Sequence, residues 1–532
     1  MLITELLKKN ATLYGDDIAL VSVYSNGLIP FDDTSYEAHR SAITWCEFNE
    51  KANQVANFYN SIGIGKGNKV GVLLMNCIHW LPVYFGIIKS GAVVVPLNFR
   101  YETADIIWST NFADVDALVL GTRCVKQVQM SLPEIPRIRS YVFVGKEELC
   151  PAFATYFKHA FGKSAKSEPN NHFTAEDDAA IYFSSGTTGA PKAVVYTNGT
   201  LEAACAREQS IHGQTKNDSF ICIPPLYHVG AKLHWMGNLL VGAKGVLLLG
   251  FTVPAFFETM SREQVTIAFL LLPWAQDILL NLDTEAIKLE NFSLENWRLL
   301  HMGAQCIPPS VVRRLKTYFP NLDYDISYGL TESGGPGCLN LGINNLHKLG
   351  SVGRPAPGWR AKIVDDKSNE TKQGEPGELL VKGPHMMRCY YKDKVTTNSV
   401  LVDGWLHTGD VAKKDSDGFY YIVDRKKDII ISGGENIYPV QIEVFLRAYK
   451  PVKDVAVFGV RHRRLGEVVV ALVELNPGTS CTEEELLEFC KSLPKYKRPR
   501  KIVFGDVPRN PTGKIEKFRL REKYSAENLD IV

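Results

Sequence analysis

Small hydroxyl residues and glycines, followed by a lysine, cluster at residues 182–198, which read YFSSGTTGAPKAVVYTN. The side chains and glycine N–H groups of this run are hydrogen-bond donors of the kind that polyphosphate oxygens accept. The flanking residues, AAIYF and AVVYT, are apolar and typical of strands, so we expect the run to be a loop between two strands. The candidate donors are Ser184, Ser185, Gly186, Thr187, Thr188, Gly189 and Lys192. The run by itself fits an anion site and a Ser/Thr/Gly-rich hairpin turn equally well.

Neither of the two common phosphate-binding motifs accounts for this loop. A Walker loop has the spacing GxxxxGK[ST] before a helix, whereas Gly186 and Gly189 are too close together and a strand is expected after Lys192. The GKS at 162–164 lacks the first glycine of a Walker loop, and the GxG at 63–65 lacks the third glycine of a dinucleotide fingerprint. We interpret both as ordinary turns.

Four further stretches rich in charged and glycine residues follow along the chain. They are SYGLTES at 327–333, GWLHTGD at 404–410, YIVDRKKDIIISGGENIYP at 421–439 and NPTGKIEK at 510–517. Together with the first loop, they closely resemble the adenylate-forming superfamily, which contains acyl-CoA synthetases, peptide-synthetase adenylation domains and luciferases. The resemblance extends from about Thr44 to Lys517, nearly the whole chain. One such motif would be weak evidence, but five in family-like order make coincidence a poor explanation.

The resemblance implies a two-step activation of a carboxylic acid. The carboxylate attacks the α-phosphate of ATP, giving an acyl adenylate and pyrophosphate, and the acyl group then passes to a thiol. Both steps concentrate negative charge, so catalysis is expected to depend on positioned donors and on Mg²⁺. The loop at 184–192 would hold the β and γ phosphates of ATP. Ala193 and Asn198 depart from the family's usual glycine and histidine without removing a phosphate donor.

Roles for individual nucleotide-site residues follow from the same resemblance. Tyr328 resembles the ring that stacks on adenine, Thr331 a phosphate donor, and Glu332 the carboxylate that binds Mg²⁺, a metal that prefers oxygen ligands. Gly303, Ala304 and Gln305 resemble the wall against the other adenine face, with Asp325 near the base edge and Gly329 in the same motif. Asp410 and Arg425 resemble the residues that bind the ribose hydroxyls. Read in isolation, most of these residues would be interpreted as turns, helix caps or surface charges.

The C-terminal motifs imply a domain that changes position between the two steps. Lys514 resembles the catalytic lysine that bridges the substrate carboxylate and the α-phosphate. Lys427 matches the hinge about which the small domain rotates, replacing Lys514 by the face that carries Gly433 and Gly434 for thioester formation. Without this context, Lys514 would be interpreted as a solvated lysine in a turn.

The acceptor is expected to be coenzyme A. An amino-acid-activating domain would carry an aspartate where Val229 follows His228, and nothing indicates a luciferase. Because no carrier-protein domain follows Val532, a free thiol is favoured, and a thiol of pKa ~8.5 is only partly ionised at neutral pH. His228 resembles a residue that gates between the half-reactions. A ligase that loads a carrier protein and a non-catalytic nucleotide sensor remain alternatives, although retention of Lys514 argues against a sensor.

The acid is less well determined than the nucleotide. Alignment with the family suggests that the acyl pocket is lined by Val229, Gly230, Leu233, Met302, Gly303, Ser327, Gly329 and Gly335. This set is apolar with small residues, which suits a medium-chain, alicyclic or aromatic acid. Acetate-activating relatives have tryptophan where Gly329 stands, so we expect open pocket volume there and acetate to be a poor substrate. Lys232 would either pair with a second substrate carboxylate or, as the simpler expectation, point to solvent.

Hydrophobic patterning predicts the elements that position these residues. From Lys69 onward, short β-branched runs alternate with helical stretches, as in an α/β sheet with covering helices. The polar stretch 22–44 is expected to form a surface hairpin or loop. After Arg425, strand candidates lie at 454–460, 468–475 and 501–507, and a helix candidate lies at 483–493. We therefore expect a large N-terminal domain with several α/β subdomains at 1–425 and a small mobile α+β domain at 426–532.

Composition excludes several classes of function. The 532 residues, 45% hydrophobic and 22% charged, are those of an ordinary globular protein with several subdomains. A formal net charge of +2 without a Lys/Arg block argues against a nucleic-acid partner. Eleven cysteines without a CxxC pair and twelve histidines without HExxH indicate reduced thiols in the cytoplasm and no zinc motif. We expect no secretory signal and no membrane span. The oligomeric state is open, with a homodimer as one option.

Overall fold

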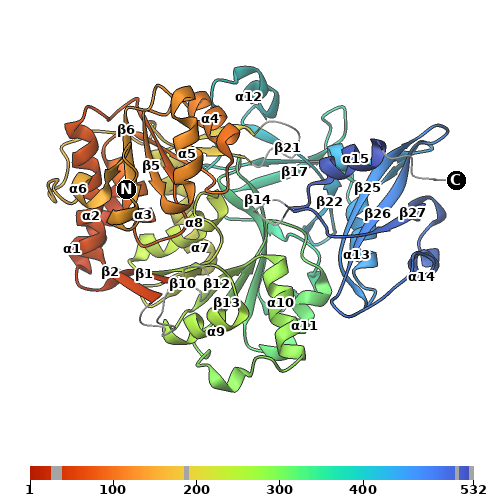
Figure 1. Cartoon of the computed structure of the whole chain (residues 1–532). Helices are drawn as coiled ribbons and strands as arrows, with labels where there is room; N and C mark the ends of the chain where they lie inside the picture. The colour runs from red at the N-terminus through yellow and green to blue at the C-terminus, as the bar shows by residue number, and fades with distance from the viewer. Residues whose placement is uncertain (25–38, 185–190, 510–513, 527–532) are drawn as a thin grey trace.

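The computed structural model describes residues 1–24, 39–184, 191–509 and 514–526, and it has a large lobe followed by a small one (Figure 1). The large lobe contains an eight-stranded, a nine-stranded and a five-stranded sheet, and the small lobe contains a second five-stranded sheet. This architecture confirms the expected fold class of a large α/β domain followed by a small α+β domain.

The eight-stranded sheet carries the ends of the first motif loop. Its order is β19-β9-β8-β4-β3-β5-β6-β7. The strands are β3 (Lys69–Leu73), β4 (Val93–Pro96), β5 (Ala117–Gly121), β6 (Ser140–Val144), β7 (Thr155–Tyr156), β8 (Asp178–Phe183), β9 (Ala193–Thr197) and β19 (Cys389–Tyr390). β8 and β9 pair antiparallel, so the two strands predicted around the donor-rich loop are present. The helices α2 (Trp45–Ser61) and α3 (Trp80–Lys89) pack against each other beside this sheet.

The nine-stranded sheet forms the wall on which the later motifs begin, and its order is β16-β15-β14-β13-β12-β10-β11-β1-β2. The strands are β1 (Ile18–Tyr24), β2 (Arg40–Thr44), β10 (Ser219–Cys222), β11 (Lys244–Leu249), β12 (Ile267–Leu270), β13 (Leu299–Met302), β14 (Asp323–Leu330), β15 (Gly335–Leu341) and β16 (Arg354–Pro355). β1 and β2 pair antiparallel, as the hairpin expected at 22–44 requires; its residues 25–38 lie outside the described part of the chain.

Helices cover both faces of the central strands of this sheet. The helices are α7 (Asn198–His212), α8 (Val229–Val241), α9 (Val253–Arg262), α10 (Leu272–Asp283) and α11 (Pro309–Tyr318). Side chains of α9, α10 and α11 share one hydrophobic cluster, and those of α7 and α8 belong to another. Because parallel strands buried on both faces are normally apolar throughout, the register partners His301 of β13 and Asp325 of β14 are exceptional.

A third sheet of the large lobe leads into the small lobe. The third large-lobe sheet contains β17 (Arg360–Val364), β18 (Gly377–Lys382), β20 (Leu401–Val402), β21 (Trp405–Lys414) and β22 (Tyr420–Arg425). The small lobe contains β23 (Ile430–Ser432), β24 (Glu435–Ile437), β25 (Val452–His462), β26 (Gly466–Leu475), β27 (Lys501–Phe504), α13 (Pro439–Leu446), α14 (Glu483–Phe489) and α15 (Lys517–Ala526). The strands and helix predicted after residue 425 are therefore present. The exact domain boundary remains a prediction.

Candidate active site

Most residues identified by the sequence motifs lie in a cleft between the lobes. Two adjoining cavities of about 220 and 570 Å³ share Leu330, Arg425, Lys427 and Lys514 in their linings. The smaller cavity is also lined by Ala304, Gln305, Ser327, Tyr328, Gly329 and Asp410. The larger one is also lined by Ser184, Lys192, Thr331 and Glu332. Residues that are far apart in the sequence therefore share one cleft.

The Asp410 carboxylate is held by two neighbours at the strand pair β21–β22. Asp410 and Arg425 are register partners, and Arg425 Nε donates to Asp410 Oδ1 at 2.8 Å. The Tyr328 hydroxyl donates to the other carboxylate oxygen at 2.5 Å. Burial and the neighbouring Asp410 charge raise the pKa of Tyr328 well above its usual value, so its hydroxyl stays protonated. The ring, the carboxylate and the guanidinium thus form one braced unit on the cleft wall.

The turn that follows β14 presents Thr331 and Glu332 to the cleft. Tyr196 donates its hydroxyl proton to the Thr331 carbonyl oxygen at 2.5 Å, and Tyr390 donates to Glu332 Oε1 at 2.8 Å. Lys192 Nζ lies 4.9 Å from the centre of the Tyr390 ring, a cation–π distance. A fixed carboxylate, a hydroxyl residue and a lysine therefore face the same cavity, a donor set that suits a Mg²⁺–polyphosphate group.

Only the two ends of the donor-rich loop are described by the structure. Ser184 N donates to the Lys192 carbonyl oxygen at 2.8 Å, and Lys192 N donates to Ser184 Oγ at 3.3 Å, which closes the base of the loop. The predicted phosphate donors between them lie outside the described residues; they are Ser185, Gly186, Thr187, Thr188 and Gly189.

Lys514 enters the cleft from the small lobe and lines both cavities. Burial and the charge of Arg425 lower the pKa of this lysine, while Asp410 and Glu332 oppose that shift. Arg509, five residues before Lys514, donates through Nη2 to Asp454 Oδ2 of the small lobe at 2.6 Å and through Nη1 to Gln305 Oε1 of the large lobe at 2.6 Å. The lobe orientation that places Lys514 in the cleft is thus reinforced by a direct contact between the lobes.

Two other predicted elements of the small lobe lie differently. Gly433 and Gly434 form the turn between β23 and β24, with left-handed φ values of 59° and 88°, and neither lines the cleft cavities described above. Lys427 lies in the short turn between β22 and β23 and lines both cavities. The roles of this glycine turn in thioester formation and of Lys427 as the hinge remain predictions.

Asp325 does not lie near the base edge as the resemblance implied. Its side chain is fully buried, and Oδ2 is 3.0 Å from His212 Nε2 and 2.5 Å from His301 Nδ1. Burial by itself would favour the neutral acid, but the two histidines hold the pKa of Asp325 at about 2. The aspartate therefore belongs to an internal charge network on the α7–α8 face of the sheet.

Glu208 is the second carboxylate of this network. It is fully buried and accepts from Arg207 Nη2 at 3.0 Å and from His234 Nδ1 at 3.0 Å, with His212 Nδ1 at 3.3 Å. Burial opposes ionisation, but His234, His212 and Arg207 together hold the pKa of Glu208 well below its usual value. His212 is thus placed between two carboxylates. Although burial lowers its pKa, hydrogen bonds to Asp325 and Glu208 raise it to about 9.

The network reaches the cleft wall through His301. His301 Nε2 lies 2.9 Å from His234 Nε2 and 3.4 Å from Ser327 Oγ, and Ser327 lines the smaller cavity. Burial and the neighbouring His234 lower the pKa of His301 to about 4, so its ring is neutral at pH 7. The predicted pocket wall is therefore backed by polar groups, in contrast to the apolar set expected from sequence.

Two predicted pocket residues need correction. The Met302 side chain packs with Leu300 and Ile326 in the hydrophobic cluster on the α9–α11 face. Strand alternation instead presents His301 to α7 and α8. Gly329 lines the smaller cavity, but a Cβ added there would lie 2.3 Å from the Gly335 carbonyl oxygen. The expected open volume for a tryptophan at position 329 is therefore absent, because β15 fills it.

The other predicted pocket residues lie at the start of α8, after β13 and at the start of β15. Val229, Leu233 and Gly335 are buried, while Gly230 is partly exposed and a Cβ added there would meet nothing within 4 Å. Gly303 follows β13, and an added Cβ would lie 3.2 Å from Ser327 Oγ. These positions are compatible with one pocket wall, although their contact with an acyl group remains a prediction.

The Lys232 side chain neither points to solvent nor is placed to pair with a second substrate carboxylate. Its side chain is fully buried, and Nζ donates to the carbonyl oxygens of Leu226 and of His228, the latter at 3.2 Å. The rings of Trp80, Tyr84 and Tyr182 surround the ammonium group at 5.0, 5.4 and 4.6 Å. Burial lowers the pKa of Lys232 well below its usual value. Both alternatives proposed for this lysine are wrong, since it braces the turn before α8.

The same turn carries His228, the predicted gate. Burial, with Lys232 and Lys514 nearby, lowers the pKa of His228 to about 3, so the ring is neutral. Its Nε2 atom is buried and has no hydrogen-bond partner within the described ranges. The proximity of Lys514 places His228 close to the cleft, as the gating prediction requires, without testing the gating itself.

Sequence reasoning missed the buried network completely. Its members on α7, α8 and β13 are Arg207, Glu208, His212, His234 and His301. The only local signal is polar residues inside apolar runs, as in LLHM and KLHW. The potential metal-ligating atoms of His212, His301 and Asp325 also lie within 4.8 Å of one another. A search for HExxH and CxxC spacing could not detect such a cluster, because its members are far apart in the sequence. Hydrogen bonding and charge pairing account for this group, and we assign no ion to it.

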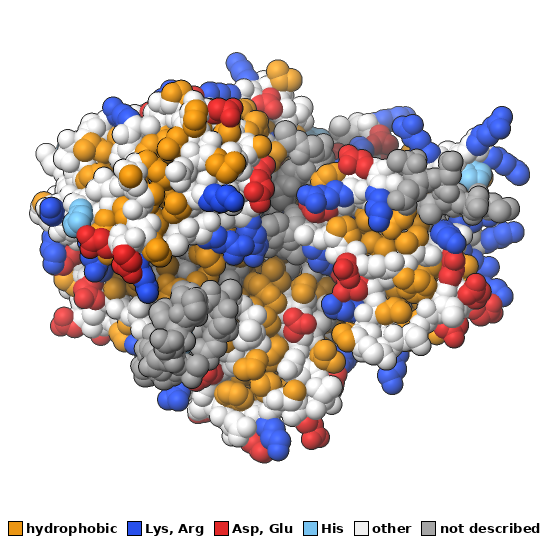
Figure 2. Space-filling view, viewed as in Figure 1, with side chains coloured by type: hydrophobic (Ala, Val, Ile, Leu, Met, Phe, Trp, Pro, Cys, Tyr) orange, Lys and Arg blue, Asp and Glu red, His pale blue; other side chains and the backbone are white. Residues whose placement is uncertain are grey.

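The outer surface is mixed in charge. On the face shown in Figure 2, basic and acidic side chains are intermingled over both lobes, which agrees with the small net charge. Within the described ranges, none of the helices combines the length and apolar character needed to cross a bilayer.

Comparison with known proteins identifies similar families, relatives and folds. The model of a family described as "AMP-binding enzyme" matches residues 7–391, and that of the "AMP-binding enzyme C-terminal domain" matches residues 441–514. The long-chain-fatty-acid–CoA ligase FadD13 of Mycobacterium tuberculosis is 29% identical over 494 residues, covering 91% of this chain and 93% of that protein. The 2-succinylbenzoate–CoA ligase of Bacillus cereus is 30% identical over 494 residues, covering 92% and 96%. The solved structure of o-succinylbenzoate CoA synthetase (MenE) from Bacillus subtilis, in complex with its acyl-adenylate intermediate, has a TM-score of 0.81, 25% identity and 97% coverage of both chains.

Proposed function

This chain belongs to the AMP-binding enzyme family, and we propose that it converts a carboxylic acid to its coenzyme A thioester through an acyl adenylate. The enzyme class is acid–thiol ligase, with ATP and coenzyme A as co-substrates. One observation carries the proposal for this chain: five residues from four separate motifs line one cleft, namely Thr331, Glu332, Asp410, Arg425 and Lys514.

Each side chain in the cleft has a proposed task in adenylate formation. Tyr328 supports the adenine ring, while the Asp410 carboxylate accepts hydrogen bonds from the ribose hydroxyls beside Arg425. Lys514 lies between the substrate carboxylate and the α-phosphate and neutralises charge that develops as the new P–O bond forms. Ser184 and Lys192, at the two ends of the loop, contact the β and γ phosphates of the departing pyrophosphate. The braced positions of Asp410 and Glu332 reduce the reorganisation that the transition state requires.

Glu332 is the proposed magnesium ligand. Its Oε1 atom is oriented by the Tyr390 hydroxyl, and the residue faces the larger cavity together with Thr331 and Lys192. A carboxylate next to phosphate-binding groups is the usual protein contribution to a Mg²⁺ site, where most other ligands are water and phosphate. When bound, the ion supplies charge neutralisation for the leaving pyrophosphate.

The second step transfers the acyl group to the coenzyme A thiol. We propose that the small lobe rotates about Lys427, so that the turn at Gly433 and Gly434 replaces Lys514 at the cleft. His228, neutral and beside the cleft, would then close or open the passage between acyl and thiol sites. We propose a substrate larger than acetate, since the relatives named above act on long-chain fatty acids and on 2-succinylbenzoate.

The proposal is tested by measuring pyrophosphate release with ATP, Mg²⁺ and a panel of aliphatic and aromatic acids, with and without coenzyme A. We expect acid-dependent pyrophosphate release, and a thioester detectable by mass spectrometry only when coenzyme A is present. Release without thioester formation would favour a carrier-protein acceptor. Absence of pyrophosphate release with every acid would favour a nucleotide-binding protein without ligase activity.

A further inference from the structure

Arg207 lies against the predicted acyl pocket without belonging to any motif of the sequence. Its side chain, 3% exposed, extends from α7 toward the start of β15. A Cβ atom added to Gly335 would lie 2.5 Å from Arg207 Nη2 and 3.2 Å from Leu233 Cδ1. Gly335 and Leu233 are both predicted pocket residues, so the guanidinium occupies the space that a side chain at position 335 would fill.

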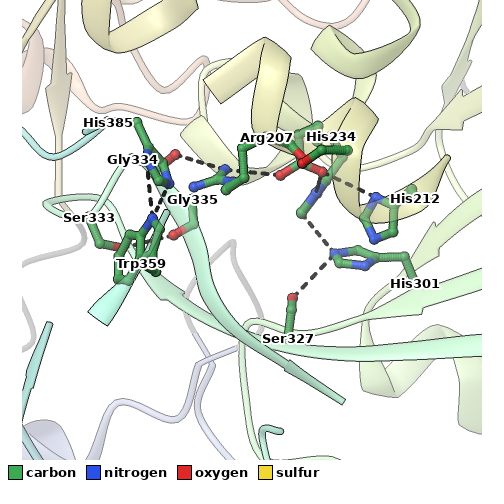
Figure 3. A network of polar contacts seen from close by, with 12 residues as sticks. Arg207, His212, His234, His301, Ser327, Ser333, Gly334, Gly335, Trp359 and His385 are labelled. Carbon is green, nitrogen blue, oxygen red and sulfur yellow. Dashed lines mark hydrogen bonds and ion pairs between the residues drawn. The ribbon is translucent and has the colours of Figure 1, made fainter. Parts of the chain in front are cut away.

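The backbone at this position leaves room for the guanidinium. Gly334 and Gly335 have φ values of 73° and 108°, a region that residues with a side chain rarely adopt. The Gly334 carbonyl oxygen accepts from Arg207 Nη2 at 3.2 Å. In Figure 3, Arg207 and Gly335 lie on one side of the view and His301 and Ser327 on the other. Two consecutive glycines thus let one arginine edge approach the pocket wall.

The Arg207 guanidinium is incompletely hydrogen-bonded. Nη2 donates to Glu208 Oε1 and to the Gly334 carbonyl oxygen, whereas the buried Nε and Nη1 atoms have no acceptor in the parts of the chain that the structure describes. A buried donor without an acceptor is costly, and arginine offers its donors in a fixed planar arrangement. The missing partner is therefore a hydrogen-bond acceptor.

Charge balance decides what kind of acceptor fits. The charge of Arg207 is offset by Glu208, whose Oε1 atom lies 3.0 Å from Arg207 Nη2. A second substrate carboxylate at the guanidinium would lie next to the buried Glu208 carboxylate, which already pairs with Arg207, and the two like charges would repel each other. An uncharged oxygen can accept hydrogen bonds from the same N–H groups without adding a charge.

We propose that Arg207 is a specificity-determining residue of the acyl pocket, and that the preferred acid carries an uncharged oxygen acceptor, a ketone or hydroxyl, in its distal part. This inference rests on the proposed ligase function. Glu208, with the histidines that hold it, acts as a positioning residue for the guanidinium. Loss of one hydrogen bond to a charged group should lower kcat/KM by about 10- to 100-fold for an acid that lacks the acceptor.

The test uses acids matched in length that differ only at the distal end. One set is hexanoate, 5-oxohexanoate and adipate; a longer set is octanoate, 7-oxooctanoate and suberate; an aromatic set is 4-ethylbenzoate, 4-acetylbenzoate and terephthalate. In at least one set, we expect the wild-type protein to prefer the ketone over both the methyl-ended acid and the diacid. Preference for the methyl-ended acid in every set, or for a diacid, would overturn the inference.

Arg207→Met and Arg207→Lys then separate recognition from folding. We expect Arg207→Met to reduce the ketone preference to about threefold or less, mainly by raising KM for the ketone, and to leave KM for ATP unchanged. Arg207→Lys, which retains a charge beside Glu208, should keep part of the preference and covers the case in which Arg207→Met does not fold. An unchanged substrate ratio in either folded variant would contradict the assignment.

Arg298→Met is the matched control. Arg298 pairs with Asp218 through two hydrogen bonds of 2.7 and 3.1 Å and donates to the His212 carbonyl oxygen at 3.0 Å. It contacts neither Glu208 nor Arg207 through its side chain, so its loss should lower stability without changing the substrate ratio. Lack of pyrophosphate release with every acid would refute the ligase proposal itself. Release with all acids but no dependence on the distal group would refute only the role of Arg207.

Discussion

Charged residues are used in opposite ways on the two sides of the cleft. On the nucleotide side, Glu332 and Lys514 come from short motifs, are partly exposed and line the cleft cavities. Behind the proposed acyl wall, Glu208, Asp325 and their histidines are fully or almost fully buried and pair with one another. On the nucleotide side, the ionised groups are therefore available to neutralise the charge of a ligand. On the other side, they set the shape and polarity of the wall.

The energetic consequences of this difference can be predicted. A charge in an open cleft is solvated before substrate binds, so its removal mainly affects catalysis. A charge inside a buried network depends on its partners, and removing one partner leaves the others without compensation. Substitutions on the two walls should therefore separate stability from activity.

The largest effect is expected for Glu208→Gln. This change leaves Arg207, His212 and His234 without their shared carboxylate, and breaking a buried ionic pair typically costs about 3–5 kcal/mol. Glu332→Gln, on the opposite wall, should change the free energy of unfolding little while abolishing adenylate formation. Thermal and urea unfolding of both variants, with pyrophosphate release, tests the pair. Equal stability of the two would remove the distinction between the walls.

Lys514→Ala should have the next largest effect, this time on catalysis. Loss of one preorganised donor costs about 2.7–4 kcal/mol, which corresponds to roughly a 10²- to 10³-fold loss of adenylation rate. Transfer from a chemically prepared acyl adenylate to coenzyme A should be spared, because the lysine is proposed to leave the cleft before that step. Lys523→Ala, an exposed lysine on α15, is the control. An equal loss in both half-reactions would argue against lobe rotation.

A pH-dependent effect comes third. His212 has a pKa of about 9 in the folded protein, compared with 6.5 for a free imidazole. Because the folded state holds the proton more tightly, this stabilisation is complete below pH 6.5 and is lost as the pH rises through 9. The contribution is roughly 3 kcal/mol. His212→Gln should therefore be less stable than wild type at pH 6, and the two should converge near pH 10.

The control for this titration is His159→Gln, which changes an exposed histidine beside Glu147. Melting temperatures of the three proteins at pH 6, 7.5, 9 and 10 provide the measurement. A stability difference between wild type and His212→Gln that stays constant across this range would show that His212 does not carry its proton between the two carboxylates.

The nucleotide side and the general fold were accessible from sequence because their signals are local. The strands around the donor-rich loop and the α/β alternation follow from hydrophobic patterning over a few residues. Glu332, Asp410, Arg425 and Lys514 each lie within a contiguous motif whose neighbours identify them. Their meeting in one cleft was implied by family resemblance and is seen in the structure.

The composition of the proposed acyl wall depended on tertiary contacts. His212 of α7 and Asp325 of β14 are 113 residues apart, and their side chains meet at 3.0 Å only in the folded chain. His301 and Asp325 are neighbours because β13 and β14 pair in parallel register. Likewise, the pattern around Lys232 predicted an exposed helical position, but rings from distant elements surround its ammonium group. Local patterning indicates that a residue is polar, whereas the energetic compensation that allows its burial depends on partners that only the folded chain brings into contact.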